Sequence, residues 1–377
     1  TSLCTSLCAL CESMFLCVGR PQATRHASQK GIRISQTTFP QFKIQHLFCV
    51  FSGITLSTLH MKRNLLAVLL CLMALPVFSQ NDIPRLMKEG VALHDEGKFD
   101  EAIRKYDSVL AIDANYYDAM FEKSYTLTMN KGYDECIVLC KRMLAMDPKN
   151  TNTRGVYVNW GTALDDKGDP EEAIKVYTEG IGKFPDYYLL HFNKGVTLML
   201  SKKNEEAMLC YQDALKLKPL HASSHQFSGR IMASSNRIAS ILSFFSFLVI
   251  EPQGDRAKQN YQDLTKLVLQ GISTTNDGKN VNINIDASVL DKSKKKTDDN
   301  FASAELLFSM SSALDNDEKF KDENAGARLF RKMESLVSML KEQKSGGSGF
   351  YWKFYVPFFI EMKDKDQLET ACYLATV

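Results

Sequence analysis

The sequence predicts an all-α protein: a solenoid of about five helix-turn-helix repeats, followed by a further helical C-terminal region with one polar loop. A recurring phrase is the first observation, because Gly-Lys-Phe-Asp-Glu-Ala-Ile at Gly97 returns in altered form at Gly132, Gly168 and Lys203. Aligned on Ala102 and its equivalents, the copies repeat every 34 residues apart from one short insertion. Apolar residues between the copies recur at helical spacing. A fixed period of this length with helical periodicity is typical of helical repeat architectures.

Residues 1–60 precede this pattern and show no sustained helical or strand period. No convincing start precedes Met61, so we expect residues 1–60 to be disordered, non-native upstream translation. Cys4, Cys8 and Cys11 form a C-x3-C-x2-C motif similar to the signature of radical-SAM enzymes, in which three thiolates converge on one iron–sulfur cluster. The alternation of strands and helices that would support such a site does not follow. We therefore interpret this spacing as coincidental.

Residues 61–79 have the composition of a secretory signal peptide. A positive start, Met61-Lys-Arg, is followed by an unbroken apolar run from Leu65 to Leu75 and by small residues before Gln80. The run is shorter than the roughly 20 residues of a transmembrane helix. We therefore expect a mature chain that begins at Gln80 and is periplasmic or otherwise exported.

The composition is that of an ordinary globular protein, with 45% hydrophobic and 24% charged residues. The net charge of +2 combines unlike parts, since residues 1–79 contain seven basic residues and one acidic residue. In the remaining chain, acidic residues outnumber basic residues by four. A mildly acidic body without a basic stripe argues against nucleic acid as the main partner.

The five predicted repeats follow one another with an insertion at 151–153; they are 83–116, 117–150, 154–187, 188–221 and 222–255. Gly97 and Gly168 are expected to break the chain between the two helices of a repeat. Acidic residues after these glycines favour the positive start of the second helix. Prolines end the second helices and set the turn into the next repeat; they are Pro148, Pro185, Pro219 and Pro252.

Packing residues account for the rest of the pattern. Small residues in the first helices are expected to let the two helices approach; they are Gly90, Gly161, Gly195 and Gly229. Aromatic residues in the second helices are expected to pack between successive hairpins; they are Tyr106, Tyr177, Tyr211 and Phe244. Cys136 and Cys140 occupy positions that other repeats fill with Ala or an aromatic residue, so buried packing is favoured over a metal site.

This pattern resembles the tetratricopeptide repeat family, whose 34-residue unit is a helix-turn-helix. The resemblance covers about 170 residues. It implies that the first helix of each repeat lines a concave groove. The groove residues implied for partner binding are Phe121, Tyr125, Met129, Asp165, Asp166, Leu189, Phe192, Val196 and Met199. Family members that grip acidic C-terminal tails carry Lys and Asn where this chain has Met87 and Val91, which argues against that partner class.

A groove rich in aromatic residues and methionine suits an apolar helix or an extended segment of a protein partner. An equally weighted alternative is that the C-terminal region of the same chain fills the groove.

Residues 256–377 are predicted to be mainly helical, with helical periodicity at 255–270, 301–314 and 325–340. A polar loop separates the first two of these segments and includes an alternating piece at 281–285 that favours a short strand. The strongly aromatic stretch at 350–362 is expected to pack as a core or cap, with membrane contact as the alternative. Because no polar capping helix follows, we expect the natural C-terminus to lie beyond Val377.

No G-x-S-x-G, H-E-x-x-H or Gly-rich phosphate loop is present, so we predict no enzyme, no cofactor and no metal site. His221 and His225 are four residues apart without a third ligand at a recognisable spacing. Signal, solenoid and aromatic appendix together resemble bacterial envelope repeat proteins, especially of Bacteroidota type. We therefore predict an exported scaffold for protein–protein interaction; the alternative is a structural subunit of an outer-membrane assembly or carbohydrate-uptake complex. Peripheral membrane association and the oligomeric state are left open.

Overall fold

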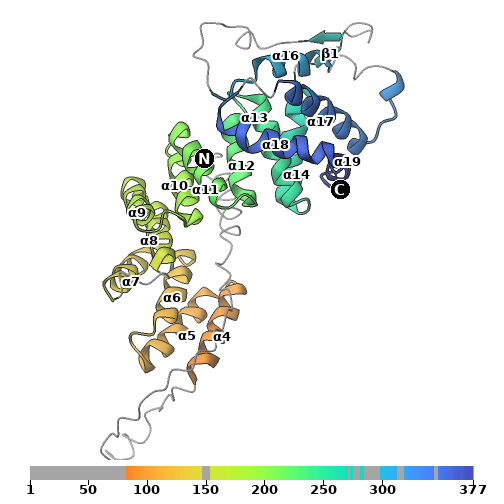
Figure 1. Cartoon of the computed structure of the whole chain (residues 1–377). Helices are drawn as coiled ribbons and strands as arrows, with labels where there is room; N and C mark the ends of the chain where they lie inside the picture. Colours follow the sequence, from red (N-terminus) through yellow and green to blue (C-terminus); the bar gives the residue numbers. More distant parts are fainter. Residues whose placement is uncertain are drawn as a thin grey trace, which may run out of the picture. The chain divides into compact units, whose positions relative to one another are not determined.

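The computed structural model describes residues 82–146, 153–270, 272–274, 281–283, 298–311, 318–343 and 347–376. The predicted upstream segment, the signal peptide and Pro148 lie outside these residues. The chain divides into two compact units, and the fold described below belongs to the second, Pro84–Val377. Regular structure in the described residues is helical apart from one short antiparallel pair of strands (Figure 1).

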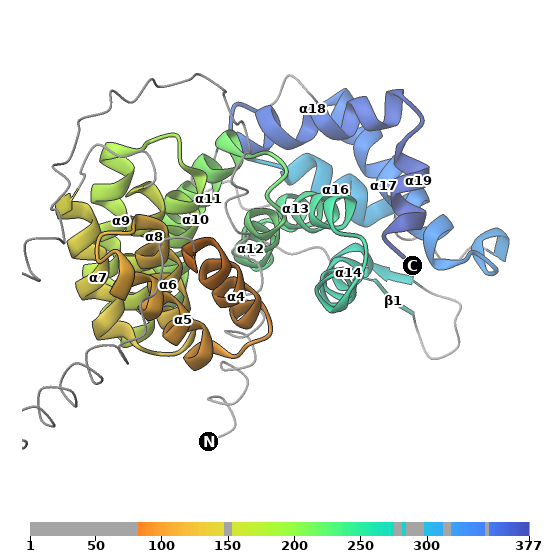
Figure 2. The ribbon, with the colours of Figure 1, turned by 90° about the horizontal axis from the view of Figure 1, so that it is seen from below.

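Five consecutive helical hairpins confirm the predicted solenoid fold class, and each of the five predicted repeats contains one hairpin. Neighbouring helices pack in chain order through the second to fifth hairpins, and Gly90 against Tyr106 and Glu89 with Lys105 join the two helices of the first (Figures 1 and 2). The pairs are α4 (Ile83–Asp95) with α5 (Phe99–Ile112), α6 (Tyr117–Met129) with α7 (Tyr133–Met146), α8 (Thr153–Lys167) with α9 (Pro170–Lys183), α10 (Tyr188–Leu200) with α11 (Asn204–Leu217), and α12 (Ala222–Met232) with α13 (Arg237–Ile250).

In four of the hairpins, a glycine of the first helix packs directly against an aromatic ring of the second helix. A Cβ added at Gly161 would lie 2.4 Å from Tyr177, and one at Gly195 would lie 2.7 Å from Tyr211. Gly90 with Tyr106 and Gly229 with Phe244 repeat this arrangement. Each of the four rings thus meets the glycine of its own hairpin. The Tyr211 ring also stacks on Phe227 of the following hairpin, with ring centroids 5.8 Å apart, as expected for packing between successive hairpins.

The turn between the two helices places one residue in the left-handed region of backbone conformation. Gly97 and Gly168 take this position with φ of +76° and +102°. Lys131 and Lys202 take it in the second and fourth hairpins, both with φ of 62°. Glycine adopts this conformation without steric cost, whereas a lysine there is strained and is held by the hairpin around it.

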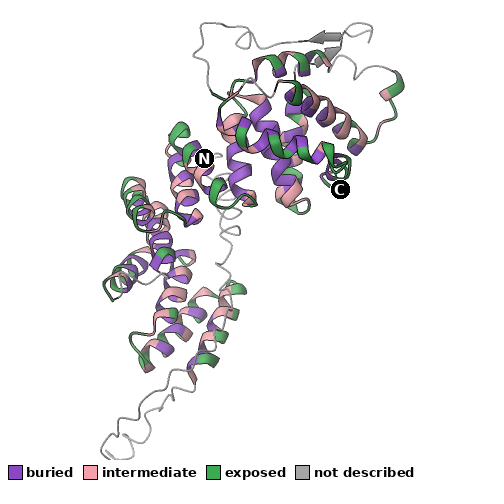
Figure 3. Ribbon diagram, viewed as in Figure 1, coloured by how far each residue is buried: buried purple, intermediate pink, exposed green. Residues whose placement is uncertain are grey.

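The C-terminal region surrounds α13, which is buried at eleven of its fourteen residues. A helix that is apolar on all sides needs partners on all sides. Its partners include α12 and α14 (Asp255–Leu269) together with α16 (Ala302–Ser311), α18 (Phe350–Asp364) and α19 (Leu368–Leu374). α17 (Ala325–Glu342) packs against α16, α18 and α19 and joins the same apolar core, as the burial colours of Figure 3 show.

Two short elements complete the described fold. β1 (Ile272–Thr274) pairs with β2 (Val281–Ile283), so that Ile272 lies opposite Ile283, at the position where the sequence predicts a strand. A single 3-10 turn spans Glu318–Phe320. No helix within the described ranges is both long enough and apolar enough to cross a membrane.

Candidate functional site

The candidate groove residues lie on α6, α8 and α10, the first helices of the second, third and fourth hairpins. These helices are consecutive in the stack, since α6 packs against α8 and α8 packs against α10. Seven of the nine side chains are half-buried, and two are buried. The seven therefore retain surface for a partner.

Phe121 and Tyr125 form the aromatic end of this set. Phe121 packs against Gly155 of the next hairpin, where an added Cβ would lie 2.8 Å from the ring. Gly155 has no side chain, so the Phe121 ring can pack closely on it, and the ring as a whole is half-buried. Tyr125 stacks on His94 of α4 with ring centroids 4.9 Å apart, and His94 Nδ1 lies 2.9 Å from Thr126 Oγ1. The sequence prediction missed His94, although it occupies the same place in the first repeat that Asp165 occupies in the third.

Asp165 and Asp166 lie in the last turn of α8, where the negative end of the helix dipole disfavours carboxylates. Thr197 Oγ1 on α10 donates a hydrogen bond to Asp165 Oδ2 over 2.7 Å. Burial raises the pKa of Asp165, and burial together with repulsion from Asp165 raises the pKa of Asp166 to about 7. Among the described residues, no hydrogen bond or ion pair neutralises Asp166. A cationic group of a partner would relieve this cost.

Val196 and Met199 form the third part of the set on α10. Both are half-buried, and the Tyr211 hydroxyl lies 3.8 Å from Met199 Sδ. Met129, at the end of α6, is half-buried as well. The carboxyl pair on α8 therefore lies between apolar side chains of the two neighbouring helices, Met129 on α6 and Val196 and Met199 on α10.

Leu189 and Phe192 are corrections to the predicted groove. Phe192 is only 4% exposed, and its ring centroid lies 4.6 Å from that of His221 and 5.9 Å from that of Phe227. Leu189 is buried in the core between the third and fourth hairpins. His221, directly before the fifth hairpin, and Phe227 within it cover Phe192, whereas the equivalent Phe121 packs against Gly155 and stays half-buried. Both residues therefore serve packing.

The C-terminal helices contact the fifth hairpin. Tyr351 on α18 shares a 3.0 Å hydrogen bond with Ser243 on α13, and Phe245 packs on Phe359. Arg237 at the start of α13 pairs with Glu305 on α16 over 2.6 Å. The contacts between these helices and the solenoid centre on the fifth hairpin, so they do not support the alternative in which the C-terminal region fills the candidate groove.

His225 has a structural role at this junction. Its Nε2 lies 2.8 Å from the Pro219 carbonyl oxygen, and its Nδ1 lies 2.8 Å from the Tyr355 hydroxyl. A carbonyl oxygen only accepts, so Nε2 carries the proton and the Tyr355 hydroxyl donates to Nδ1. Burial lowers the pKa of His225 to about 4. In the described part of the chain, no group of three or more His, Cys, Asp and Glu side chains has the geometry of a metal site.

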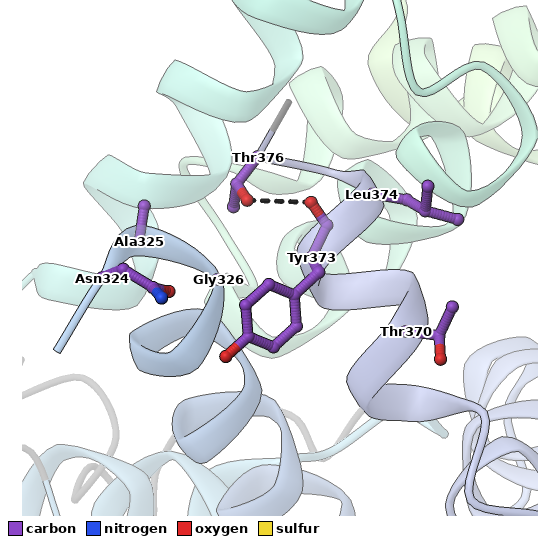
Figure 4. A pocket seen from close by; sticks show the side chains of 7 residues that line it. All are labelled: Asn324, Ala325, Gly326, Thr370, Tyr373, Leu374 and Thr376. Atoms are coloured by element: carbon purple, nitrogen blue, oxygen red, sulfur yellow. Dashed lines mark hydrogen bonds between the residues drawn. The ribbon is translucent and has the colours of Figure 1, made fainter.

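A separate depression lies between α17 and α19 (Figure 4). It has a volume of about 380 Å³ and is lined by Asn324–Gly326 and by Tyr373 and Leu374, among others. Its lining is almost entirely apolar, and Asn324 is occupied in capping α17 through the Ala327 amide. No predicted groove residue lines it.

A family model covers the middle of the solenoid. Residues 158–222, from α8 to the start of α12, match the tetratricopeptide repeat. The match shows a tetratricopeptide repeat in this part of the chain. The matched repeats include Asp165, Asp166, Val196 and Met199, whereas Phe121, Tyr125 and Met129 precede them.

Solved structures of tetratricopeptide repeat proteins are similar in fold. TTC0263, a thermophilic TPR protein of Thermus thermophilus, is 19% identical with a TM-score of 0.43, covering 48% of this chain and 99% of that chain. The pilF protein of Pseudomonas aeruginosa is 18% identical with a TM-score of 0.42, covering 50% and 90%. YrrB, a TPR protein with an unusual peptide-binding site, is 18% identical with a TM-score of 0.34, covering 46% and 90%. No curated protein matches the chain.

Proposed function

We propose that this chain is an exported, non-catalytic scaffold that binds an apolar peptide or helix of a protein partner. The proposed binding surface consists of the half-buried side chains Phe121, Tyr125, Met129, Asp165, Asp166, Val196 and Met199. Stacked helical repeats form extended concave surfaces that bind partners in this way. The fold therefore supports a protein or peptide as the ligand class.

One observation carries the proposal: apolar side chains on consecutive first helices retain exposed area around a carboxyl, Asp166, that lacks a counter-charge among the described residues. A partner segment with apolar residues on both sides of one Lys or Arg would bury the exposed apolar side chains of this surface, and its basic group would pair with the Asp166 carboxylate. Charge-assisted pairs of this kind are stronger than neutral hydrogen bonds.

Export rests on residues 61–79, which lie outside the described residues. Fractionation of producing cells, with sequencing of the mature N-terminus, tests it. Export predicts a chain that begins at Gln80 outside the cytoplasm. A mature protein that begins upstream of Gln80 or stays in the cytoplasm would contradict this part of the proposal.

Photo-crosslinking tests the groove. A photoreactive residue at Val196 should form a specific adduct with the partner in producing cells, whereas the same residue at Leu209, exposed on α11 outside the proposed surface, should not. Asp166→Asn should weaken the Val196 adduct without lowering the melting temperature. Equal labelling from both positions would reject the groove. If a transporter or assembly barrel co-purifies through other surfaces, the alternative role as a structural subunit is favoured.

A further inference from the structure

A second surface lies on α18, away from the proposed groove. α18 buries one side in the C-terminal core through residues such as Tyr351, Tyr355 and Phe359. Its other side carries side chains that keep exposed area, and we call these residues, together with 216–220, the basic-aromatic face. Its members on α18 are Phe350, Lys353, Phe354, Pro357 and Phe358.

The end of α11 and the loop after it continue this face. Lys216 Nζ lies 5.9 Å from the centroid of the Phe350 ring. His225 connects the Pro219 carbonyl to the Tyr355 hydroxyl, so the loop and α18 are held together by one side chain. Leu220 in this loop is 70% exposed, and Phe358 on α18 is 42% exposed. The face therefore presents large apolar side chains from two chain segments that are fixed to each other.

Basic side chains accompany the exposed apolar residues. Lys218 and Lys353 are exposed, and in the described part of the chain neither lies within ion-pair distance of a carboxylate. Two nearby acids are engaged elsewhere, since Asp213 pairs with Lys216 and Glu361 pairs with Lys365. The exposed Asp298 precedes α18, and its backbone carbonyl accepts a hydrogen bond from the Gly349 amide. Asp299 accepts hydrogen bonds from the backbone at the start of α18. Lys218 and Lys353 thus present positive charge outside any ion pair among the described residues, beside aromatic rings.

We infer that the basic-aromatic face docks on the surface of an anionic lipid bilayer. Lysines beside aromatic and leucine side chains match such a surface, because the ammonium groups reach the lipid phosphates while the apolar groups enter the boundary with the acyl chains. α18 itself lies at the edge of the C-terminal helices (Figure 2), and the depression between α17 and α19 shares no residue with the face. It offers a broad contact for a membrane and not a groove for a peptide.

Vesicle co-sedimentation of the full chain tests this inference. We expect binding to vesicles with about one third phosphatidylglycerol, weak binding to pure phosphatidylcholine, and loss of binding at high salt. Lys218→Gln and Lys353→Gln should each weaken binding about five-fold. Phe358→Ser with Leu220→Ser should weaken it about ten-fold or more, because both side chains are expected to enter the bilayer boundary.

Matched controls carry the same kinds of change elsewhere on the solenoid. Val138→Ser with Leu209→Ser removes two exposed apolar side chains from α7 and α11, and Lys175→Gln removes an exposed lysine from α9. These variants should bind like the parent chain, and all variants should keep its melting temperature. Equal binding to neutral vesicles, unchanged binding of the face variants, or equal loss in the controls would overturn the inference. Self-association that Phe358→Ser abolishes without any lipid binding would overturn it in favour of a dimer contact.

Discussion

Gly161→Ala should destabilise the solenoid because of a single methyl group. The added Cβ would lie 2.4 Å from Tyr177 Cε1, far inside contact distance, and Tyr177 is 1% exposed, so its ring has no free space to enter. Overpacking of this kind costs about 1–3 kcal/mol. Displacing the ring also strains the 3.0 Å hydrogen bond between Tyr177 and Thr162, worth about 1 kcal/mol. Alanine regains about 1 kcal/mol of helix propensity. We therefore expect a net loss of about 1–3 kcal/mol.

Thermal and urea unfolding of the full chain measure this loss, which corresponds to a fall in melting temperature of about 2–10 °C. Gly182→Ala on α9 is the matched control, because an added Cβ there meets nothing within 4 Å. It should stabilise the chain by up to about 1 kcal/mol. Combining Gly161→Ala with Tyr177→Leu should cost less than the sum of the two single changes, because the leucine vacates the clash. If Gly161→Ala is as stable as Gly182→Ala, the proposed contact between glycine and aromatic ring is wrong.

Three further outcomes follow from the junction and the groove. Burial lowers the pKa values of His221 and His225 to about 4, so the unfolded chain binds more protons than the folded chain below pH 6.5. The contribution of these groups to stability should be complete above pH 6.5 and fall towards pH 4 by up to about 3 kcal/mol per histidine. Melting curves across this pH range, compared with those of His225→Asn, check the slope. The raised pKa of Asp166 makes its charged form costly, so stability should decline as the pH rises from about 4 to 7. In urea titrations at pH 8, Asp166→Asn should stabilise the chain by about 1–2 kcal/mol. A loss of stability in this variant would show that a favourable contact holds the carboxylate. Phe192→Ala should lower the free energy of unfolding by about 3–5 kcal/mol because this ring is buried, whereas Val196→Ala should lower it much less. Similar losses in the two variants would show that Val196 belongs to the core as well.

Local signals made the hairpins predictable. The glycines at 97 and 168 have the positive φ that the turn needs, and the same turn at Lys131 and Lys202 is identified by the period and not by its own residue. The 34-residue spacing thus supplied information that residue propensity alone contradicts at those two lysines. This is the reason that the solenoid could be predicted from a sequence with imperfect repeats.

Contacts between hairpins were less predictable, because a repeat position gives the direction of a side chain but not the size of its neighbour. Phe121 and Phe192 occupy equivalent positions, yet one is half-exposed beside Gly155 and the other is enclosed by His221 and Phe227. The raised pKa of Asp166 also depends on enclosure that no spacing reveals. Side chains from different repeats decide both cases.

The long-range packing of α13 explains why two separate surfaces can exist on one chain. This apolar helix would be half-uncovered at the end of a simple solenoid, and the C-terminal helices cover it through contacts such as Ser243 with Tyr351. Covering α13 uses one side of α18 and leaves Phe358 and Lys353 on the other, while the half-buried residues of α6, α8 and α10 keep their exposed area. The proposed partner groove and the basic-aromatic face therefore share no residue. Met199→Ser should reduce partner crosslinking from the photoreactive residue at Val196 and leave vesicle binding intact, and Phe358→Ser should do the reverse. If each change abolishes both activities, the two surfaces act as one site and the assignment of separate roles fails.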